Sequence, residues 1–307
     1  MKNARLISLL AAGTLGLGGA TEGPAARQAL EWKQAAPLPV PRSEVAAATV
    51  GKELVIAGGF LADGRSSKRV DAYSPARNRW RRLPDLPVAV NHAMAASAGK
   101  QLYVVGGYGA PTRAFVFSKG RWRRLPNLPA PRAAAGAAIV GRTLYVIGGV
   151  ASGGLARKAL AFDRVRRRWS VIAGPKPREH LGVSALGNRV YAVAGRESGV
   201  NFDALEAYDP SRKRWSALPP VPETRGGTDT AAVGSLLVSA GSESAAGSSA
   251  AVYAYDVRAR SWSRLPDLPT PRHGLGVLAF AGRVYVIGGG PTPGLSVSAA
   301  NEYLQLR

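Results

Sequence analysis

The chain has no cysteine, which excludes disulfide bonds, thiolate-ligated metals and a cysteine nucleophile. Histidine is scarce as well, with only three residues in 307. The sequence also contains no glycine-rich phosphate loop, no HExxH metal-binding sequence and no GxSxG nucleophile elbow. Because no catalytic motif remains, the sequence favours a binding protein over an enzyme.

Acidic residues are few relative to basic ones. The chain carries 19 Asp and Glu against 41 Lys and Arg, for a formal net charge of +22. A charge so far from neutrality attracts anionic partners. We therefore expect that an anionic cell-surface polymer could be a partner.

Long apolar runs are missing except at the N-terminus. There, two basic residues precede an apolar stretch over residues 6–17, and Gly18 and Ala20 supply the small residues of a cleavage site. This pattern predicts a signal peptide over residues 1–20 and a short linker over 21–30, with a secreted or periplasmic mature protein. An uncleaved membrane anchor is the alternative, although the stretch is short for a bilayer.

Repetition is the main positive signal. All six tryptophans recur at intervals of 42–48 residues: Trp32, Trp80, Trp122, Trp169, Trp215 and Trp262. A Gly-Gly or Ala-Gly pair recurs in step after a short apolar run, and its second members are Gly59, Gly107, Gly149, Gly195, Gly241 and Gly289. An aromatic residue lies seven positions before five of the tryptophans: Tyr73, Phe115, Phe162, Tyr208 and Tyr255. Six occurrences in register predict six copies of one structural unit.

A glycine pair, an aromatic residue and a tryptophan in this order resemble the kelch repeat, and the resemblance covers residues 31–307. It implies an all-β protein, a six-bladed kelch β-propeller with four short strands in each blade. The last repeat has Tyr303 but ends before its own tryptophan. We therefore expect the N-terminal strand around Trp32 to close the last blade, which removes an open sheet edge.

The loops between the second and third strands, and those between blades, should meet at one mouth of the propeller. Loops on a rigid scaffold often carry function. Aligning the repeats on their glycine pairs places polar residues there, and these are the candidate ligand-binding residues: Ser43, Asn91, His92, Glu179, His180, Arg196, Glu197, Arg225 and His273. The arginines of the recurring Pro-Arg dipeptide are expected to be structural donors to loop carbonyls: Arg42, Arg132, Arg178 and Arg272.

The three histidines all fall at this mouth and admit three interpretations. They could be ordinary polar residues of the rim, they could hydrogen-bond an organic ligand, or they could bind a metal on the axis. His92 and His180 share one position in the repeat, whereas His273 lies one residue earlier. Because side chains alternate along a strand, this offset argues against a shared metal, and no metal or other cofactor is predicted.

The resemblance implies a binding module that recognises a protein or a glycan at the mouth. The alternative is a sugar-handling enzyme, since secreted kelch propellers include sialic acid mutarotases; Glu197 and Arg196 would be the candidate catalytic residues. Kelch copper oxidases need a Tyr–Cys crosslink and are excluded. A nucleic-acid partner is not expected, because the tryptophans are required between blades and cannot stack on bases.

Overall fold

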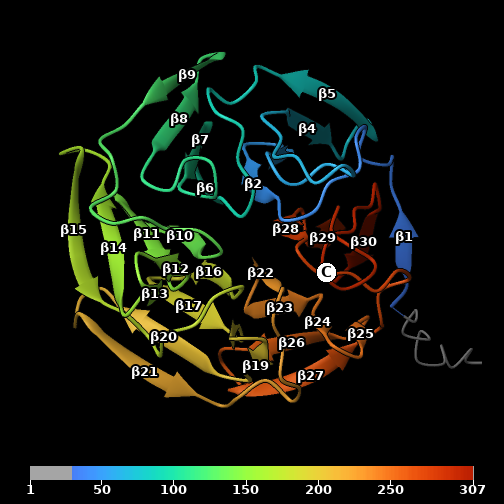
Figure 1. The fold of residues 1–307 in the computed structure, drawn as a ribbon. Helices are drawn as coiled ribbons and strands as arrows, with labels where there is room; N and C mark the ends of the chain where they lie inside the picture. The colour runs from blue at the N-terminus through green and yellow to red at the C-terminus, as the bar shows by residue number, and fades with distance from the viewer. Residues whose placement is uncertain (1–29, 307) are drawn as a thin grey trace, which may run out of the picture.

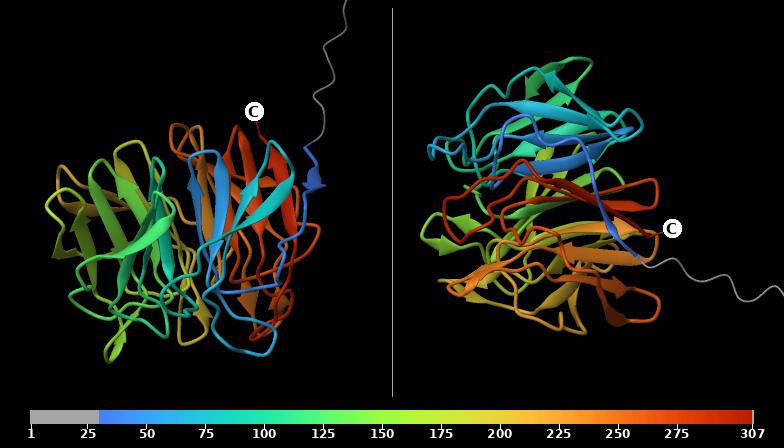
Figure 2. Two further views of the ribbon diagram at one scale, coloured as in Figure 1. Left: turned by 90° about the horizontal axis from the view of Figure 1, so that it is seen from above. Right: turned by 90° about the vertical axis from the view of Figure 1, so that its right-hand side faces the viewer.

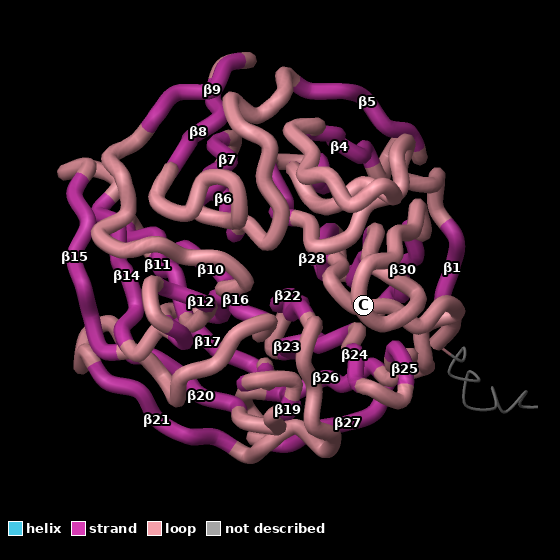
Figure 3. Tube along the Cα trace, viewed as in Figure 1, coloured by secondary structure: helices cyan, strands magenta, loops and turns pink. Residues whose placement is uncertain are grey.

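The computed structural model describes residues 30–306, which form a six-bladed β-propeller (Figure 1). Every blade is a four-stranded antiparallel sheet, and residues 30–306 contain strands and loops but no helix (Figure 3). Within this range, therefore, no helix could cross a membrane. The predicted leader and nearly all of the predicted linker lie outside the described residues.

The blades follow one another in chain order. Blade one contains β2 (Ala46–Val50), β3 (Glu53–Ala57), β4 (Val70–Ser74) and β5 (Arg79–Leu83). Blade two contains β6 (Met94–Ala98), β7 (Gln101–Val105), β8 (Ala114–Ser118) and β9 (Arg121–Arg124). Blade three contains β10 (Gly136–Val140), β11 (Thr143–Ile147), β14 (Lys158–Asp163) and β15 (Arg168–Ala173).

Blade four contains β16 (Gly182–Leu186), β17 (Arg189–Val193), β20 (Leu205–Asp209) and β21 (Arg214–Leu218). Blade five contains β22 (Asp229–Val233), β23 (Leu236–Ala240), β26 (Val252–Asp256) and β27 (Ser261–Leu265). Blade six contains β28 (Gly276–Phe280), β29 (Arg283–Ile287), β30 (Asn301–Gln305) and β1 (Trp32–Gln34). The loops of blades three, four and five each carry a small hairpin: β12 (Val150–Ala151) with β13 (Gly154–Leu155), β18 (Arg196–Glu197) with β19 (Val200–Asn201), and β24 (Glu243–Ser244) with β25 (Gly247–Ser248).

The side chains differ in size from the innermost strand of each blade to the outermost. The innermost strands are rich in alanine and other small residues, as in AAATV of β2 and GAAIV of β10, because six strands crowd around one axis (Figure 1). The second strands are apolar and nearly fully buried, as in ELVIA of β3. The buried residues form six clusters, and each cluster joins two neighbouring blades; one includes Val55 and Val70 of blade one with Val104 of blade two. The core therefore lies between the blades, where burial of apolar surface stabilises the ring.

The tryptophans lie on the outermost strands and connect each blade to the preceding one. Every indole Nε1–H donates to a backbone carbonyl of the adjacent blade's loop at 2.8–2.9 Å: Trp32 to Pro266, Trp80 to Ala36, Trp122 to Pro84, Trp169 to Pro126, Trp215 to Ala173 and Trp262 to Pro219. Five of the rings also pack on an aromatic residue of the next strand inward, with centroids 4.9–5.3 Å apart. The repeated tryptophan thus supplies both apolar area and a directed hydrogen bond.

The prediction for closure of the propeller is confirmed. β1 pairs antiparallel with β30, with Trp32 opposite Leu304 and Gln34 opposite Glu302. Two views show this strand from the beginning of the described chain beside the C-terminal strands (Figure 2). The Gln34 amide also donates to Glu302 at 3.1 Å. Blade six is therefore built from both ends of the described chain, and its sheet is as wide as the others.

Two positions of the predicted repeat alignment are wrong. In blade two, Phe117 and not Phe115 faces Trp122, because the hairpin between β8 and β9 is shorter than in the other blades. In blade five, Ser242 N–H makes the interblade bond that the second glycine makes elsewhere, so the glycine pair corresponds to Gly241–Ser242. Gly241 consequently occupies the first position of the pair and not the second.

The arginines of the loops between blades are structural, as expected. Arg42, Arg178 and Arg272 are fully buried, and each pairs with a carboxylate while donating to backbone carbonyls. Their partners are Asp71 at 2.5 Å, Glu206 at 2.5 Å and Glu302 at 2.7 Å. Arg132 is 3% exposed and donates to carbonyls alone. Because removing one partner leaves the other charge buried, these pairs hold the loops in a single arrangement.

The closure can be tested by replacing Trp32 with phenylalanine. The substitution keeps an aromatic ring but removes the hydrogen bond to Pro266 and some apolar contact, so Trp32→Phe should lower the free energy of unfolding by about 1–3 kcal/mol. Trp122→Phe, at the equivalent place in blade two, is the matched control and should cost about the same. Urea unfolding measures both values. An effect of Trp122→Phe with none for Trp32→Phe would show that β1 contributes nothing to stability.

Candidate functional site

Six residues, one from each blade, form a ring of backbone hydrogen bonds around the axis at one end of the central channel. Each blade contributes one residue with a left-handed backbone, with φ between 49° and 72°: Glu44, His92, Ala134, His180, Gly227 and Gly274. Each of the last five donates its N–H to the carbonyl of the preceding one at 2.8–3.0 Å, and Val45 N–H closes the ring on Gly274 at 3.5 Å. All six residues of the ring line the same cavity. The side chains of Glu44, His92 and His180 therefore lie together at one end of it.

Glycine makes room for these side chains at two positions. A Cβ on Gly274 would lie 2.3 Å from Glu44 Oε1, and one on Gly226 would lie 2.9 Å from Arg196 Cδ. Both distances are too short for non-bonded atoms. Gly274 also has a positive φ, which glycine adopts without the steric cost that a Cβ brings. These two glycines therefore belong to the site although they carry no chemistry.

Glu44 lies at the centre of the three histidines. Its Oε2 is 3.2 Å from His92 Nε2 and 3.9 Å from His180 Nε2, and its Oε1 is 3.9 Å from His273 Nε2. The His92 and His180 rings meet edge to face, with centroids 4.9 Å apart. All four side chains are at most 13% exposed, so the cluster is enclosed by protein on most sides.

Arg196 joins the cluster through two other carboxylates. Its Nη1 donates to Glu243 Oε1 at 2.6 Å, and its Nε lies 3.4 Å from Glu179 Oε1. Glu243 Oε2 in turn lies 3.3 Å from His273 Nε2. The cluster thus holds three carboxylates and one guanidinium beside the three histidines, and it concentrates acidic residues in a strongly basic protein.

The surroundings shift the protonation equilibria of this cluster. Burial would raise the pKa of the Glu44 carboxyl, but the three histidines and Arg196 outweigh it and hold that pKa below its ordinary value. The His180 ring is the main cause that lowers the pKa of Glu179. Burial lowers the pKa of His92, against the opposite effect of Glu44. The Glu44 and Glu179 carboxylates therefore remain ionised at neutral pH, and His92 is predominantly neutral.

Comparison with known families agrees with this architecture. A model described as the KLHDC2/KLHL20/DRC7 Kelch-repeats domain matches residues 91–290, and a model described as the Kelch motif matches residues 41–87. The chain belongs to the kelch-repeat family. A comparison with curated proteins gave no match.

The mouth of this kelch propeller brings together most of the residues predicted from the sequence. Asn91, His92, Glu179, His180, Arg196 and His273 lie within the cluster or in direct contact with it. Ser43 is buried beside it, where its backbone pairs with Phe60. Glu197 is exposed on β18, and its side chain has no polar contact with any residue in 30–306. The pair Arg196 and Glu197 thus does not converge on one point of the mouth.

Arg225 lies away from the candidate site. It is fully buried, donates to the backbone carbonyls of Ser239 and Ala251, and has its pKa lowered to about 10 by burial. It is the blade-five counterpart of Arg42, Arg132, Arg178 and Arg272. The alignment placed it at the rim because Ala240-Gly241 was read as the glycine pair, which shifts blade five by one residue.

The same shift concealed Glu243, which follows the true pair Gly241–Ser242 as Arg196 follows its own pair. Anchoring blade five on its arginine, as in the other repeats, would have found it. Glu44 was also missed, although it shares its repeat position with His92 and His180. The three histidines were expected not to point the same way, and His273 groups with Glu44 and Glu243 and not with His92 and His180. Its Nε2 nevertheless comes within 3.9 Å of Glu44 Oε1, because the left-handed residues before each inner strand interrupt simple alternation.

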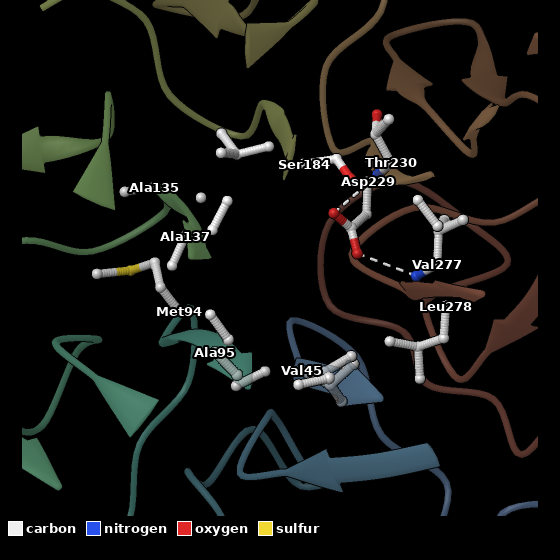
Figure 4. Close-up of a pocket in the computed structure, with 18 of the residues that line it drawn as sticks. Val45, Met94, Ala95, Ala135, Ala137, Ser184, Asp229, Thr230, Val277 and Leu278 are labelled. Atoms are coloured by element: carbon white, nitrogen blue, oxygen red, sulfur yellow. Dashed lines mark hydrogen bonds between the residues drawn. The ribbon is translucent and has the colours of Figure 1, made fainter. Parts of the chain in front are cut away.

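Beneath the ring, the axis of the kelch propeller is a channel with a cavity volume of about 360 Å³. Its wall is formed mostly by alanine, valine and glycine of the innermost strands, and the Asp229 side chain points into it (Figure 4). The Asp229 carboxylate accepts hydrogen bonds from Thr230 N–H at 2.8 Å and from Val277 N–H of blade six at 3.0 Å. These bonds only partly offset burial, which raises the pKa of Asp229 to about 6.

Asp229 should make stability depend on pH. Its proton is held more tightly in the folded than in the unfolded protein, where the ordinary pKa is 3.8. The free energy of unfolding should therefore fall as pH rises from about 4 to 7, by about 3 kcal/mol at most from this group. Asp229→Asn should remove this component, as measured by urea unfolding at several pH values. Ser184→Ala is the control, because it changes another polar residue of the channel wall that does not titrate, and its curve of unfolding free energy against pH should run parallel to that of the wild type. A parallel curve for Asp229→Asn would contradict the prediction.

Proposed function

We propose that this kelch propeller is an exported binding module whose mouth recognises a protein or a glycan. Kelch propellers generally serve in protein interaction, and the family membership of this chain supports that role. One further observation carries the assignment to the mouth: exposed apolar side chains border the enclosed polar cluster there. Tyr108 is 44% exposed, Val200 is 64% exposed and Leu295 is 56% exposed.

These side chains come from three different blades but lie close to the cluster. The Tyr108 ring packs edge to face on His92, with centroids 5.3 Å apart. Leu295 follows Gly294, whose carbonyl lies 3.1 Å from His273 Nε2. Val200 lies on the hairpin that starts with Arg196. Tyr is enriched in binding hot spots, and Val200 and Leu295 add exposed apolar surface around the same polar cluster.

Partner binding is expected to depend on this face. A glycan array and capture from a cell-envelope fraction would supply candidate ligands, whose affinity is then measured for purified variants. The double variant Tyr108→Ala, Leu295→Ser should weaken binding by about tenfold or more, which corresponds to about 1.4 kcal/mol. Val165→Ser, Val171→Ser is the matched control, because these residues are 73% and 57% exposed and lie on the opposite face and outer strand of blade three. Loss of binding in the control alone would show that the binding surface includes Val165 and Val171, and this result would contradict the proposal.

Export rests on the leader pattern alone, because residues 1–29 lie outside the described structure. The expected outcome is a mature protein that begins near Thr21, found by N-terminal sequencing of the native protein. Intact Met1 on protein recovered from the cytoplasm would contradict export.

A second surface supports contact with an anionic polymer. The outermost strands and their turns carry exposed basic side chains, the basic belt: Arg77, Arg79, Arg121, Arg123, Arg167, Arg168, Lys213, Arg214, Arg258 and Arg260. Other arginines of these strands are neutralised, as Arg81 is by Glu53 at 2.6 Å. The belt would give weak, salt-sensitive adhesion and not selective recognition.

A further inference from the structure

Three potential metal ligands converge where the ring opens into the channel. His92 Nε2, His180 Nε2 and a Glu44 carboxylate oxygen come from blades two, four and one, and these atoms all lie within 4.8 Å of one another. A tetrahedral zinc ion with bonds of about 2.1 Å holds its ligand atoms roughly 3.4 Å apart. The observed separations of 3.2 and 3.9 Å from Glu44 Oε2 bracket this value.

A neighbouring side chain orients the His92 ring. Its Nδ1 lies 2.6 Å from Asn91 Oδ1, and the orientation of this amide is set by its Nδ2–H, which donates to Ser66 Oγ at 2.7 Å. His180 Nδ1 lies 3.3 Å from Glu179 Oε1 but makes no hydrogen bond within residues 30–306. In both residues Nδ1 thus faces an oxygen atom, whereas Nε2 is the nitrogen nearest to Glu44.

The consequence is a small site bounded by three potential ligand atoms. The two Nε2 atoms and the Glu44 carboxylate face one another from three blades. A cation between them would contact all three atoms. A histidine oriented through Nδ1 by a carboxylate or amide oxygen is the usual outer shell of a metal-bound imidazole.

We propose that Glu44, His92 and His180 bind one divalent transition-metal ion, of which Zn²⁺ is the representative, at the mouth of the channel. Two imidazole nitrogens and one carboxylate oxygen suit Zn²⁺, Fe²⁺ or Co²⁺ better than a soft ion that requires thiolates or a hard ion that requires only oxygen. Asn91 holds the His92 ring in position, and Glu179 lies beside the His180 ring. The site is independent of the partner-binding role proposed for the exposed rim.

His273 is excluded from this ligand set by its own contacts. Its Nε2 has the Gly294 carbonyl at 3.1 Å and Glu243 Oε2 at 3.3 Å as acceptors, and Glu243 is also bound to Arg196. A proton on that nitrogen is therefore satisfied by the protein. The ion is expected to be single, with Glu44 as its only carboxylate ligand.

Three protein ligands leave a coordination position open. Structural zinc sites are closed by four protein ligands, whereas three ligands and an exchangeable position characterise reactive ones. Glu44, His92 and His180 all line the central cavity. The open position therefore faces the channel, where a water molecule or a small ligand with an oxygen or nitrogen donor would complete the coordination.

The test uses the tag-free full chain, because a polyhistidine tag would itself bind the ion. After treatment with a chelator, calorimetric titration with Zn²⁺ should show one ion per chain, and Co²⁺ should give a visible absorption spectrum that saturates at the same ratio. His92→Gln and His180→Gln should each weaken Zn²⁺ binding by more than about tenfold, and Asn91→Ala by about 10–100-fold through loss of ring orientation.

Two further variants keep the test decisive. Asp63→Asn removes one negative charge from a loop of the same face, where Asp63 pairs with Arg65, and should leave the affinity unchanged. Glu44→Gln preserves the shape of the central side chain and supplies the ligand test should a histidine variant not fold. Unfolding temperatures measured without metal show which variants are folded.

The proposal is overturned if the wild-type chain binds no stoichiometric Zn²⁺ or Co²⁺. It is equally overturned if His273→Gln abolishes binding while folded His92→Gln and His180→Gln retain it. In the first case the cluster would be a hydrogen-bonded charge network without a metal. In the second case the ion would lie among Glu44, Glu243 and His273 and not among the proposed ligands. A rise in unfolding temperature on addition of Zn²⁺ for the wild type, absent in Glu44→Gln, supports the site by an independent measurement.

Discussion

The ring of backbone hydrogen bonds around the axis is the constraint on which the site depends. It passes from blade to blade through one left-handed residue in each, so the position of each of these residues is set by its two neighbours in the ring. A non-glycine residue adopts this conformation only where the surrounding structure enforces it. Glu44, His92, Ala134 and His180 do so here, which brings the Glu44 carboxylate within 4 Å of His92 and His180 from distant parts of the chain.

The ring persists only because the propeller is closed and its loops are pinned. β1 completes blade six beside β30, and Gln34 of β1 contacts the same Glu302 that pairs with the buried Arg272. The Arg272 carbonyl in turn accepts the N–H of Ser242 in blade five. Closure at the outer edge is thus connected through a buried ion pair to the loops that border the mouth.

Charge is divided between two surfaces of the molecule. The basic belt accounts for much of the excess of lysine and arginine, whereas the mouth gathers Glu44, Glu179 and Glu243 around a single arginine. Composition alone suggested a protein that attracts anionic partners. The enclosed mouth differs, because its one guanidinium is occupied by two carboxylates and the third carboxylate, that of Glu44, faces three histidines.

The sequence by itself determined the kelch repeat, the number of blades and the closure by Trp32, because these depend on short patterns that recur at nearly constant spacing. It also placed the three histidines and Arg196 at one mouth. Only the tertiary structure decided which of these residues meet. In blade five the pair lies one residue later than the sequence pattern suggested, which places Arg225 in the core and Glu243 at the mouth. The left-handed ring brings His273 toward Glu44 against simple alternation. The physical reason is that repeat spacing fixes which blade a residue belongs to, whereas the direction of a side chain depends on backbone angles that neighbouring blades impose.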